Sequence, residues 1–193
     1  MRKIGITGGI GSGKSFVSHI LETRFGIPIY NSDAQAKRLM TEDQSLVQGL
    51  QSLLGKDAYL PDGRLNRPFI ASYLFASPRH AARINALVHP IVCEDFERWS
   101  LAQTSATVGV ESAILLESGL EKLVDDILLV EACEETRLQR TIKRDQTQAE
   151  NVRARMAQQD IAAMRLAATW VINNEKDNNE NDIYKQIKEL GIC

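Results

Sequence analysis

The spacing of apolar residues at the start of the chain changes from strand-like to helical and back. Residues 3–7 are a short β-rich run, and glycines follow them directly. Residues 14–25 then carry apolar side chains at helical spacing, and residues 27–30 read as a second strand. Ser32 is the predicted N-cap of a helix over residues 33–40. Strand, glycine loop, helix and strand form a βαβ unit, which predicts parallel pairing.

A mostly helical segment is predicted between residues 43 and 103. Residues 43–54 place leucine and valine side chains on one face, which predicts a helix. Residues 68–76 and 78–103 are predicted to follow as helices with no strand between them. Pro90 is expected to kink the longer helix, because proline removes a backbone donor and disfavours the helical conformation of the residue before it.

Strand-like and helical segments alternate in the rest of the chain. The strand-like runs are residues 107–110, 127–131 and 170–172. The helical segments are residues 134–144 and 149–159, and a last helix with an apolar stripe follows around residues 183–190. About five strands alternating with helices predict an α/β fold with a doubly wound, five-stranded parallel sheet.

A phosphate-binding loop lies between the first strand and the first helix. Residues 8–15 read GGIGSGKS and fit the pattern G-x-x-x-x-G-K-[ST]. Glycines let backbone N–H groups wrap a phosphate, and the N-terminus of the following helix favours anions. Lys14 is expected to reach the β- and γ-phosphates of ATP, and Ser15 to supply an oxygen to Mg²⁺. The predicted ATP-binding residues of the loop are Gly9, Gly11, Ser12, Gly13, Lys14 and Ser15.

This loop indicates ATP or GTP binding without naming the reaction. Small-molecule kinases and GTPase-type switch proteins both use it. A GTPase needs N-K-x-D and D-x-x-G strings, and neither occurs in this chain. The helical segment and the arginine-rich residues 134–159 suit a kinase, which closes over two substrates and excludes water. Both classes stay open at this point.

Further sequence strings occur in a fixed order along almost the whole chain. They are ITGGIGSGKS at 6–15, NSD at 31–33, DGRLNR at 62–67, HP at 89–90, LLE at 115–117, Arg140, RD at 144–145, Gln159 and INN at 172–174. Their order and spacing resemble the dephospho-coenzyme A kinase family. The resemblance implies a P-loop kinase fold and transfer of the γ-phosphoryl group of ATP to the ribose 3′-hydroxyl of dephospho-CoA, with Mg²⁺ as cofactor. The alternatives are another nucleoside or nucleotide monophosphate kinase and a nucleotide-dependent switch protein.

The resemblance also implies a division within a single kinase domain. Its parts are a core of residues 1–42, 104–136 and 160–193, an acceptor-binding insert of about residues 43–103 and a lid of about residues 137–159. Two positions depart from the family. Phe16 replaces a usual threonine, so it keeps the backbone N–H expected at the α-phosphate of ATP and lacks the hydroxyl. Ala113 stands where the family usually has proline, so the backbone conformation of the loop after the third strand is not predicted by the resemblance.

Asp33 is the first candidate for the catalytic and acceptor-binding carboxylate. It follows the second predicted strand, at the carboxyl edge of the sheet where ligands bind. From spacing alone, two interpretations stay open: Asp33 belongs to the first turn of its own helix and stabilises it, or it orients and accepts the proton of the 3′-hydroxyl. The resemblance favours the catalytic role.

Arg140 and Arg144 lie one helical turn apart and therefore face the same side. Guanidinium groups match phosphate oxygens. By resemblance both belong to the lid, Arg140 as a catalytic and ATP-binding residue and Arg144 as a substrate-binding residue. The alternative is a solvated helix face on which Arg137, Lys143 and Asp145 form surface ion pairs.

Two acidic residues are candidates near the predicted third strand. Glu111 ends an apolar run, and such a residue commonly holds Mg²⁺ through water in phosphate-loop proteins, here together with Ser15. The alternative is a solvent-facing residue just past the strand. Glu117 matches the family's LLE string and is assigned a structural role near the site, although a contact with Mg²⁺-bound water stays open for it.

The remaining assignments depend on the resemblance. Arg64 and Arg67 are expected to pair with the phosphates of dephospho-CoA, and His89 to lie on the acceptor side. The alternatives are two surface arginines beside a turn and a histidine packed in an amphipathic helix. Asn174 follows the last strand, where the resemblance implies contacts with the adenine of ATP, and a polar turn is the alternative.

Composition limits the classes of partner. The chain has 193 residues with a formal net charge of -2, so it lacks the basic excess of a dedicated nucleic-acid binder. No apolar run reaches the ~20 residues needed to span a bilayer. The three cysteines lie far apart and form no CxxC pair, which favours reduced thiols. We therefore expect a cytoplasmic protein with a small-molecule substrate, no nucleic-acid or membrane partner, and a monomeric or small homo-oligomeric state.

Overall fold

The computed structural model describes residues 1–175 and 179–192. The chain divides into two compact units. The first consists of residues 1–30 and 102–193, and the second of residues 31–101. The helical segment predicted from residue 43 is thus part of a unit that begins at Asn31 and includes the preceding helix.

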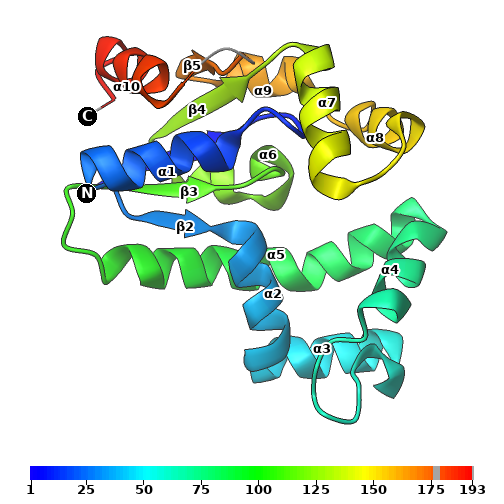
Figure 1. Cartoon of the computed structure of the whole chain (residues 1–193). Coiled ribbons are helices and arrows are strands. Elements are labelled where there is room, and N and C mark those ends of the chain that lie inside the picture. Colours follow the sequence, from blue (N-terminus) through cyan, green and yellow to red (C-terminus); the bar gives the residue numbers. More distant parts are fainter. Residues whose placement is uncertain (176–178, 193) are drawn as a thin grey trace. The chain divides into compact units, whose positions relative to one another are not determined.

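The first unit is built on a five-stranded sheet (Figure 1). The strands are β1 (Arg2–Thr7), β2 (Ile29–Asn31), β3 (Thr107–Glu111), β4 (Asp126–Glu131) and β5 (Trp170–Asn173). Their order is β2-β3-β1-β4-β5, and β1 pairs in parallel with both β3 and β4, as β4 does with β5. The predicted parallel α/β sheet is confirmed, and β1, which leads into the phosphate loop, lies at its centre.

Helices cover both faces of this sheet. They are α1 (Lys14–Phe25), α6 (Leu115–Ser118), α7 (Glu134–Asp145), α8 (Ala149–Met156), α9 (Ile161–Ala167) and α10 (Glu180–Glu189), with a 3₁₀ turn at Leu120–Leu123. Ile4 and Ile6 are buried in one core with apolar side chains of α1 and α10. Gly5, which points to the other face because strand residues alternate, packs against Leu115 of α6. This two-sided covering is the doubly wound arrangement that the sequence predicted.

The second unit is helical. Its elements are α2 (Ser32–Glu42), α3 (Gln44–Leu54), α4 (Arg67–Ala76) and α5 (Pro78–Leu101), with a 3₁₀ turn at Lys56–Ala58. α5 continues as one helix through Pro90 (Figure 1). Its apolar stripe, including Ile84, Val88, Val92 and Phe96, is buried, and α2, α3 and α4 pack against this helix.

The predicted N-cap of α2 is wrong by one residue. Asn31 is the N-cap: its side chain accepts a hydrogen bond from the backbone N–H of Ala34 at 2.9 Å, and Ser32 is the buried first residue of the helix. Asn and Ser are equally good capping residues, so side-chain chemistry alone does not decide whether Asn31 or Ser32 is the N-cap. The extended backbone of Asn31, which ends β2, decides the position.

Candidate active site

The phosphate loop joins β1 to α1 and is enclosed by α7 and the segment after β5. Gly11 and Gly13 have φ angles of 78° and 91°, which favour glycine. A Cβ atom on Gly11 would meet the backbone carbonyl of Arg137, and one on Gly13 would meet the side-chain amide of Asn174. The two glycines therefore allow Arg137 and Asn174 to pack closely on the outside of the loop, and this packing stabilises the loop conformation.

Lys14 lies over its own loop. Its Nζ donates hydrogen bonds to the carbonyl oxygens of Gly8 at 2.8 Å and Gly9 at 3.3 Å. Ser12 is buried, and its hydroxyl has no hydrogen-bond partner among the described residues. Phe16 has an exposed fraction of 38%, and its backbone N–H donates to Gly13 within the first helical turn. The loop thus holds a cation beside acceptors that phosphate oxygens can replace.

Ser15 and Glu111 form a hydrogen-bonded pair. The Ser15 hydroxyl donates to Oε1 of Glu111 at 2.6 Å. Glu111 is the last residue of β3 and is only 8% exposed. This excludes the alternative interpretation of Glu111 as a solvent-facing residue just past the strand. Parallel pairing places Glu111 opposite Ile6 of β1, which brings the carboxylate to the edge where the loop begins.

The oxygen atoms of this pair fit a magnesium ion. Mg²⁺ prefers hard oxygen ligands and is usually held by one or two carboxylates together with substrate phosphates. The described residues contain no group of three or more His, Cys, Asp or Glu side chains that could hold a metal alone. Glu117, by contrast, is exposed on α6.

Arg140 ties α7 to two other segments. Its guanidinium donates to three backbone carbonyls: Nη1 to Ser12 at 3.4 Å and to Asn174 at 2.8 Å, and Nη2 to Glu175 at 3.0 Å. It is not part of a solvated face with surface ion pairs. The residue links the phosphate loop, α7 and the segment after β5.

Asn174 contacts the same loop from the other side. It is only 2% exposed, and its Nδ2 donates to the carbonyl oxygen of Ser12 at 2.8 Å. Its Oδ1 has no partner among the described residues. A solvated polar turn at this position is therefore excluded, and the amide lies against the phosphate loop.

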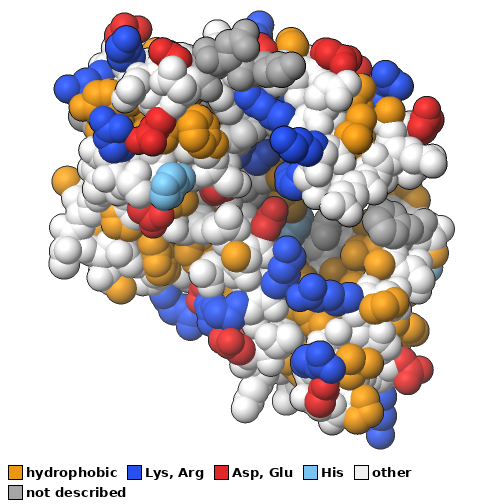
Figure 2. Space-filling view, in the orientation of Figure 1, with side chains coloured by type: hydrophobic (Ala, Val, Ile, Leu, Met, Phe, Trp, Pro, Cys, Tyr) orange, Lys and Arg blue, Asp and Glu red, His pale blue; other side chains and the backbone are white. Residues whose placement is uncertain are grey.

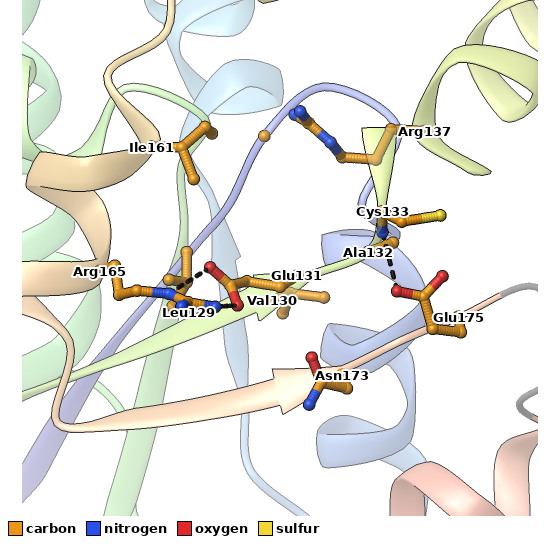
Figure 3. A pocket seen from close by; sticks show the side chains of 11 residues that line it. Leu129, Val130, Glu131, Ala132, Cys133, Arg137, Ile161, Arg165, Asn173 and Glu175 are labelled. Carbon is orange, nitrogen blue, oxygen red and sulfur yellow. Dashed lines mark hydrogen bonds and ion pairs between the residues drawn. The ribbon is translucent and has the colours of Figure 1, made fainter. Parts of the chain in front are cut away.

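Arg137 lines a cavity of about 270 Å³ at the ends of β4 and β5 (Figure 3). It points from α7 toward Gly9, and its Nη1 is buried with no hydrogen-bond partner in the described part of the chain. Arg165, on another wall, pairs with Glu131. The alternative in which Arg137 forms a surface ion pair does not hold, because this side chain lies against the phosphate loop.

Glu175 fixes the start of α7 and is not among the site residues that the sequence predicts. Its Oε1 accepts from the backbone N–H of Cys133 at 2.8 Å, and its Oε2 from the Thr136 hydroxyl at 3.2 Å (Figure 3). The bond from Cys133 lowers the pKa of Glu175, and a negative charge at a helix N-terminus is favourable. No local pattern indicates a partner so distant in sequence. Cys93 and Cys133 form no disulfide bond in the described part of the chain, and Cys193 lies outside the described residues.

Arg144 and Asp145 form a surface cluster at the end of α7. Asp145 accepts from Arg144 at 2.7 Å and from Arg155 at 2.8 Å. The hydrogen bond from Arg144, followed by that from Arg155, lowers the pKa of Asp145 to about 2. The surface pair is therefore the interpretation that the structure supports for Arg144.

Gln159, which follows α8, contacts the phosphate loop. Its side-chain oxygen accepts a hydrogen bond from the backbone N–H of Ile10 at 2.7 Å, which ties the end of the α7–α8 segment to this loop.

The predicted acceptor-side residues lie in the second unit. Asp33 is exposed in the first turn of α2, and Asn31 rather than Asp33 provides the cap. Arg64 and Arg67 line one groove of about 690 Å³, and Arg64 pairs with Asp62 at 2.7 Å. His89 is half-buried in α5 and is not among the residues that line this groove.

Comparison with known proteins assigns the fold to a family. Residues 2–180 match the family model described as dephospho-CoA kinase. The chain belongs to the dephospho-CoA kinase family. A dephospho-CoA kinase of Bacteroides fragilis is 41% identical over 191 residues, covering 97% of this chain and 90% of the relative. A dephospho-CoA kinase of Porphyromonas gingivalis is 43% identical over 160 residues, covering 83% and 78%.

Solved structures share the fold of this chain. The structure of TT1252 from Thermus thermophilus is 31% identical, with a TM-score of 0.83, and the match covers 99% of this chain and 96% of that one. Dephospho-CoA kinase from Campylobacter jejuni matches with a TM-score of 0.70 over 100% of this chain and 96% of that one. At 21% identity, the second likeness supports the fold alone.

Proposed function

We propose that this chain is a dephospho-CoA kinase, which transfers the γ-phosphoryl group of ATP to the ribose 3′-hydroxyl of dephospho-CoA and releases coenzyme A and ADP. The match of residues 2–180 to the family carries this proposal. The intact phosphate loop with its Ser15–Glu111 pair supports it, because phosphoryl transfer needs these parts.

The first unit holds the donor. The phosphates of ATP are bound by the phosphate loop, to which Phe16 adds its backbone N–H. The loop residues proposed to bind are Gly9, Gly11, Ser12, Gly13, Lys14 and Ser15. Lys14 exchanges the carbonyls of Gly8 and Gly9 for phosphate oxygens, which are stronger acceptors because they are charged. Ser15 and Glu111 would hold Mg²⁺, Glu111 through water. When bound, the ion would supply positive charge that offsets the negative charge of the phosphates.

Asp33 acts on the acceptor. Its carboxylate orients the 3′-hydroxyl and accepts its proton as the hydroxyl oxygen bonds to the γ-phosphorus and the bond to the ADP oxygen breaks. The transition state is loose, so alignment contributes more than basicity. The exposed position in the first turn of α2, with capping left to Asn31, supports this role because the carboxylate keeps free acceptor sites.

Residues 137–159 form the lid in this proposal. Arg140 positions the nucleotide by joining the phosphate loop to Asn174, which lies on the adenine side. To reach a transferring phosphate, Arg140 must release the carbonyls of Asn174 and Glu175. Arg144 reaches substrate only by leaving Asp145.

The second unit provides the acceptor site, with Arg64 and Arg67 for its phosphates and His89 beside it. The groove lined by both arginines supports the first assignment. In the described part of the chain, no helix is long and apolar enough to cross a membrane. A cytoplasmic location, the lack of a nucleic-acid partner and a monomeric or small homo-oligomeric state stay predictions.

The acceptor is tested by ADP release from MgATP with a panel of dephospho-CoA, AMP, GMP, CMP and adenosine. We expect turnover with dephospho-CoA far above that with the other compounds. A preference for a monophosphate would assign the chain to another kinase reaction. Slow hydrolysis with no acceptor effect would favour a nucleotide-dependent switch protein.

A further inference from the structure

The groove of the second unit has a strongly basic wall. Its volume is about 690 Å³, and the described residues that line it include four cations and no carboxylate. The cations are Lys37 and Arg38 from α2, and Arg64 and Arg67 from the segment that leads into α4. Basic side chains also gather over α2 in Figure 2. Because like charges repel one another, four cations in one groove favour the binding of an anionic ligand.

Two of these cations already have acidic partners. Arg38 pairs with Glu42 at 3.0 Å and with Asp95 at 2.9 Å, and Arg64 pairs with Asp62. Lys37 and Arg67 have no ion pair or side-chain hydrogen bond within residues 1–175 and 179–192. Lys37 and Arg67 are therefore the two cations of the groove that no acidic side chain of the described residues neutralises.

The spacing of Lys37 and Asp33 on α2 suggests what the anion is attached to. They are four residues apart and exposed, so their side chains share a face with ~5–6 Å between Cβ atoms. In a nucleotide, five bonds of ~1.5 Å join the ribose 3′-oxygen to the 5′-phosphorus, a span on the order of 5–6 Å. Side chains that start this far apart can reach both ends of one ribose, the carboxylate of Asp33 at its 3′-hydroxyl and the ammonium of Lys37 at its 5′-phosphate.

We propose that Lys37 is a positioning and specificity residue that binds the 5′-phosphate of the acceptor, with Arg67 taking the adjoining phosphate of its pyrophosphate. The inference rests on the proposed function and extends it by assigning the two ends of the acceptor ribose to one helical turn. Lys37 and Arg67 would then require an acceptor with a 5′-pyrophosphate, while Asp33 selects the hydroxyl that reacts.

The test is steady-state kinetics of full-length Lys37→Ala with dephospho-CoA and MgATP. Loss of one charge-assisted hydrogen bond predicts a KM for dephospho-CoA raised about tenfold or more. The kcat and the KM for ATP should stay within about threefold of wild type. Lys37→Arg, which keeps the charge, should restore most of the affinity. Arg79→Ala is the matched control, because it removes an exposed cation of the same unit that does not line the groove.

The outcomes separate this inference from the function itself. If wild-type protein does not phosphorylate dephospho-CoA, the function is wrong and the inference falls with it. If wild type is active and Lys37→Ala keeps its KM for dephospho-CoA, only the inference is wrong. An equal rise in the KM for ATP, or a fall in kcat alone, also contradicts it. Lys37→Gln, with circular dichroism as a folding check, replaces the alanine variant if that variant does not fold.

Discussion

At the scale of single residues, Gly9 and Gly11 differ in what lies outside the phosphate loop. A Cβ on Gly9 would meet the guanidinium end of Arg137, which is flexible. A Cβ on Gly11 would meet the backbone carbonyl of the same residue, at a φ of 78°. The loop therefore has one position that can yield to a larger side chain and one that cannot.

We predict that Gly11→Ala weakens ATP binding about tenfold or more, because strained backbone costs ~1–3 kcal/mol where nothing can relax. Gly9→Ala should weaken it less. Adding Arg137→Ala should restore binding to Gly9→Ala and not to Gly11→Ala, as measured by calorimetry with MgATP. Equal rescue of both variants would show that the carbonyl of Arg137 is not the obstacle.

The Ser15–Glu111 pair gives a second residue-scale prediction. Glu111→Gln should raise the Mg²⁺ concentration for half-maximal activity about tenfold or more, because it removes the charge that attracts the cation and keeps the side-chain shape. Glu117→Gln is the matched control, since Glu117 is exposed on α6. An unchanged Mg²⁺ requirement in Glu111→Gln would rule out the metal role.

The sequence predicted those site residues whose chemistry follows from neighbours in the chain. Lys14 and Ser15 belong to a continuous motif, and Glu111 ends a recognisable strand. Arg137 and Glu175 could not be placed in this way. Arg137 occupies a helix position that predicts a surface residue, yet its side chain packs against Gly9, which lies 128 residues earlier in the chain. Glu175 follows β5 and accepts a hydrogen bond at the start of α7, which is also distant in sequence.

At the scale of elements, Asp145 joins the end of α7 to α8. It accepts hydrogen bonds from Arg144 and Arg155, and these lower its pKa to about 2. A carboxyl group with a lowered folded-state pKa stabilises the fold above its unfolded value, near 3.8, and loses that contribution as the pH falls through about 2. The contact should therefore hold the α7–α8 pair at neutral pH.

Asp145→Asn is predicted to lower the melting temperature by a few degrees at pH 7, because the two arginines lose their shared acceptor. The difference from wild type should shrink as the pH falls from about 4 toward 2. Thermal melts across this range measure it. Glu22→Gln, at an exposed position of α1, controls for loss of one negative charge. A difference that does not change with pH would contradict the ionic origin.

Element prediction succeeded where several turns supported one pattern. The bounds of α1 match its apolar spacing, and α5 begins at the predicted residue 78 and ends at Leu101, close to the predicted residue 103. The short α9 was missed, because its seven residues bury only Met164 and give too little periodicity. Its signal was Asp160, whose side chain caps the helix by accepting from the N–H of Ala163.

At the scale of the whole molecule, the proposed reaction draws its residues from both units. The phosphate loop, which is proposed to bind ATP, belongs to the first unit and Asp33 to the second. A single change in the second unit should therefore stop chemistry without disturbing the donor site. Asp33→Asn is predicted to lower kcat about 100-fold or more, the range of a lost general base, with the affinity for ATP unchanged. Near-normal turnover would remove Asp33 from the mechanism.

We propose above that this chain phosphorylates the 3′-hydroxyl of dephospho-CoA. The most direct measurement is the structure of the product made from dephospho-CoA and MgATP, by mass spectrometry and phosphorus NMR. We expect one added phosphoryl group, present as a monoester on the ribose 3′-oxygen, with one ADP formed for each. ADP formed without a phosphorylated acceptor, or phosphate at another position, would contradict it.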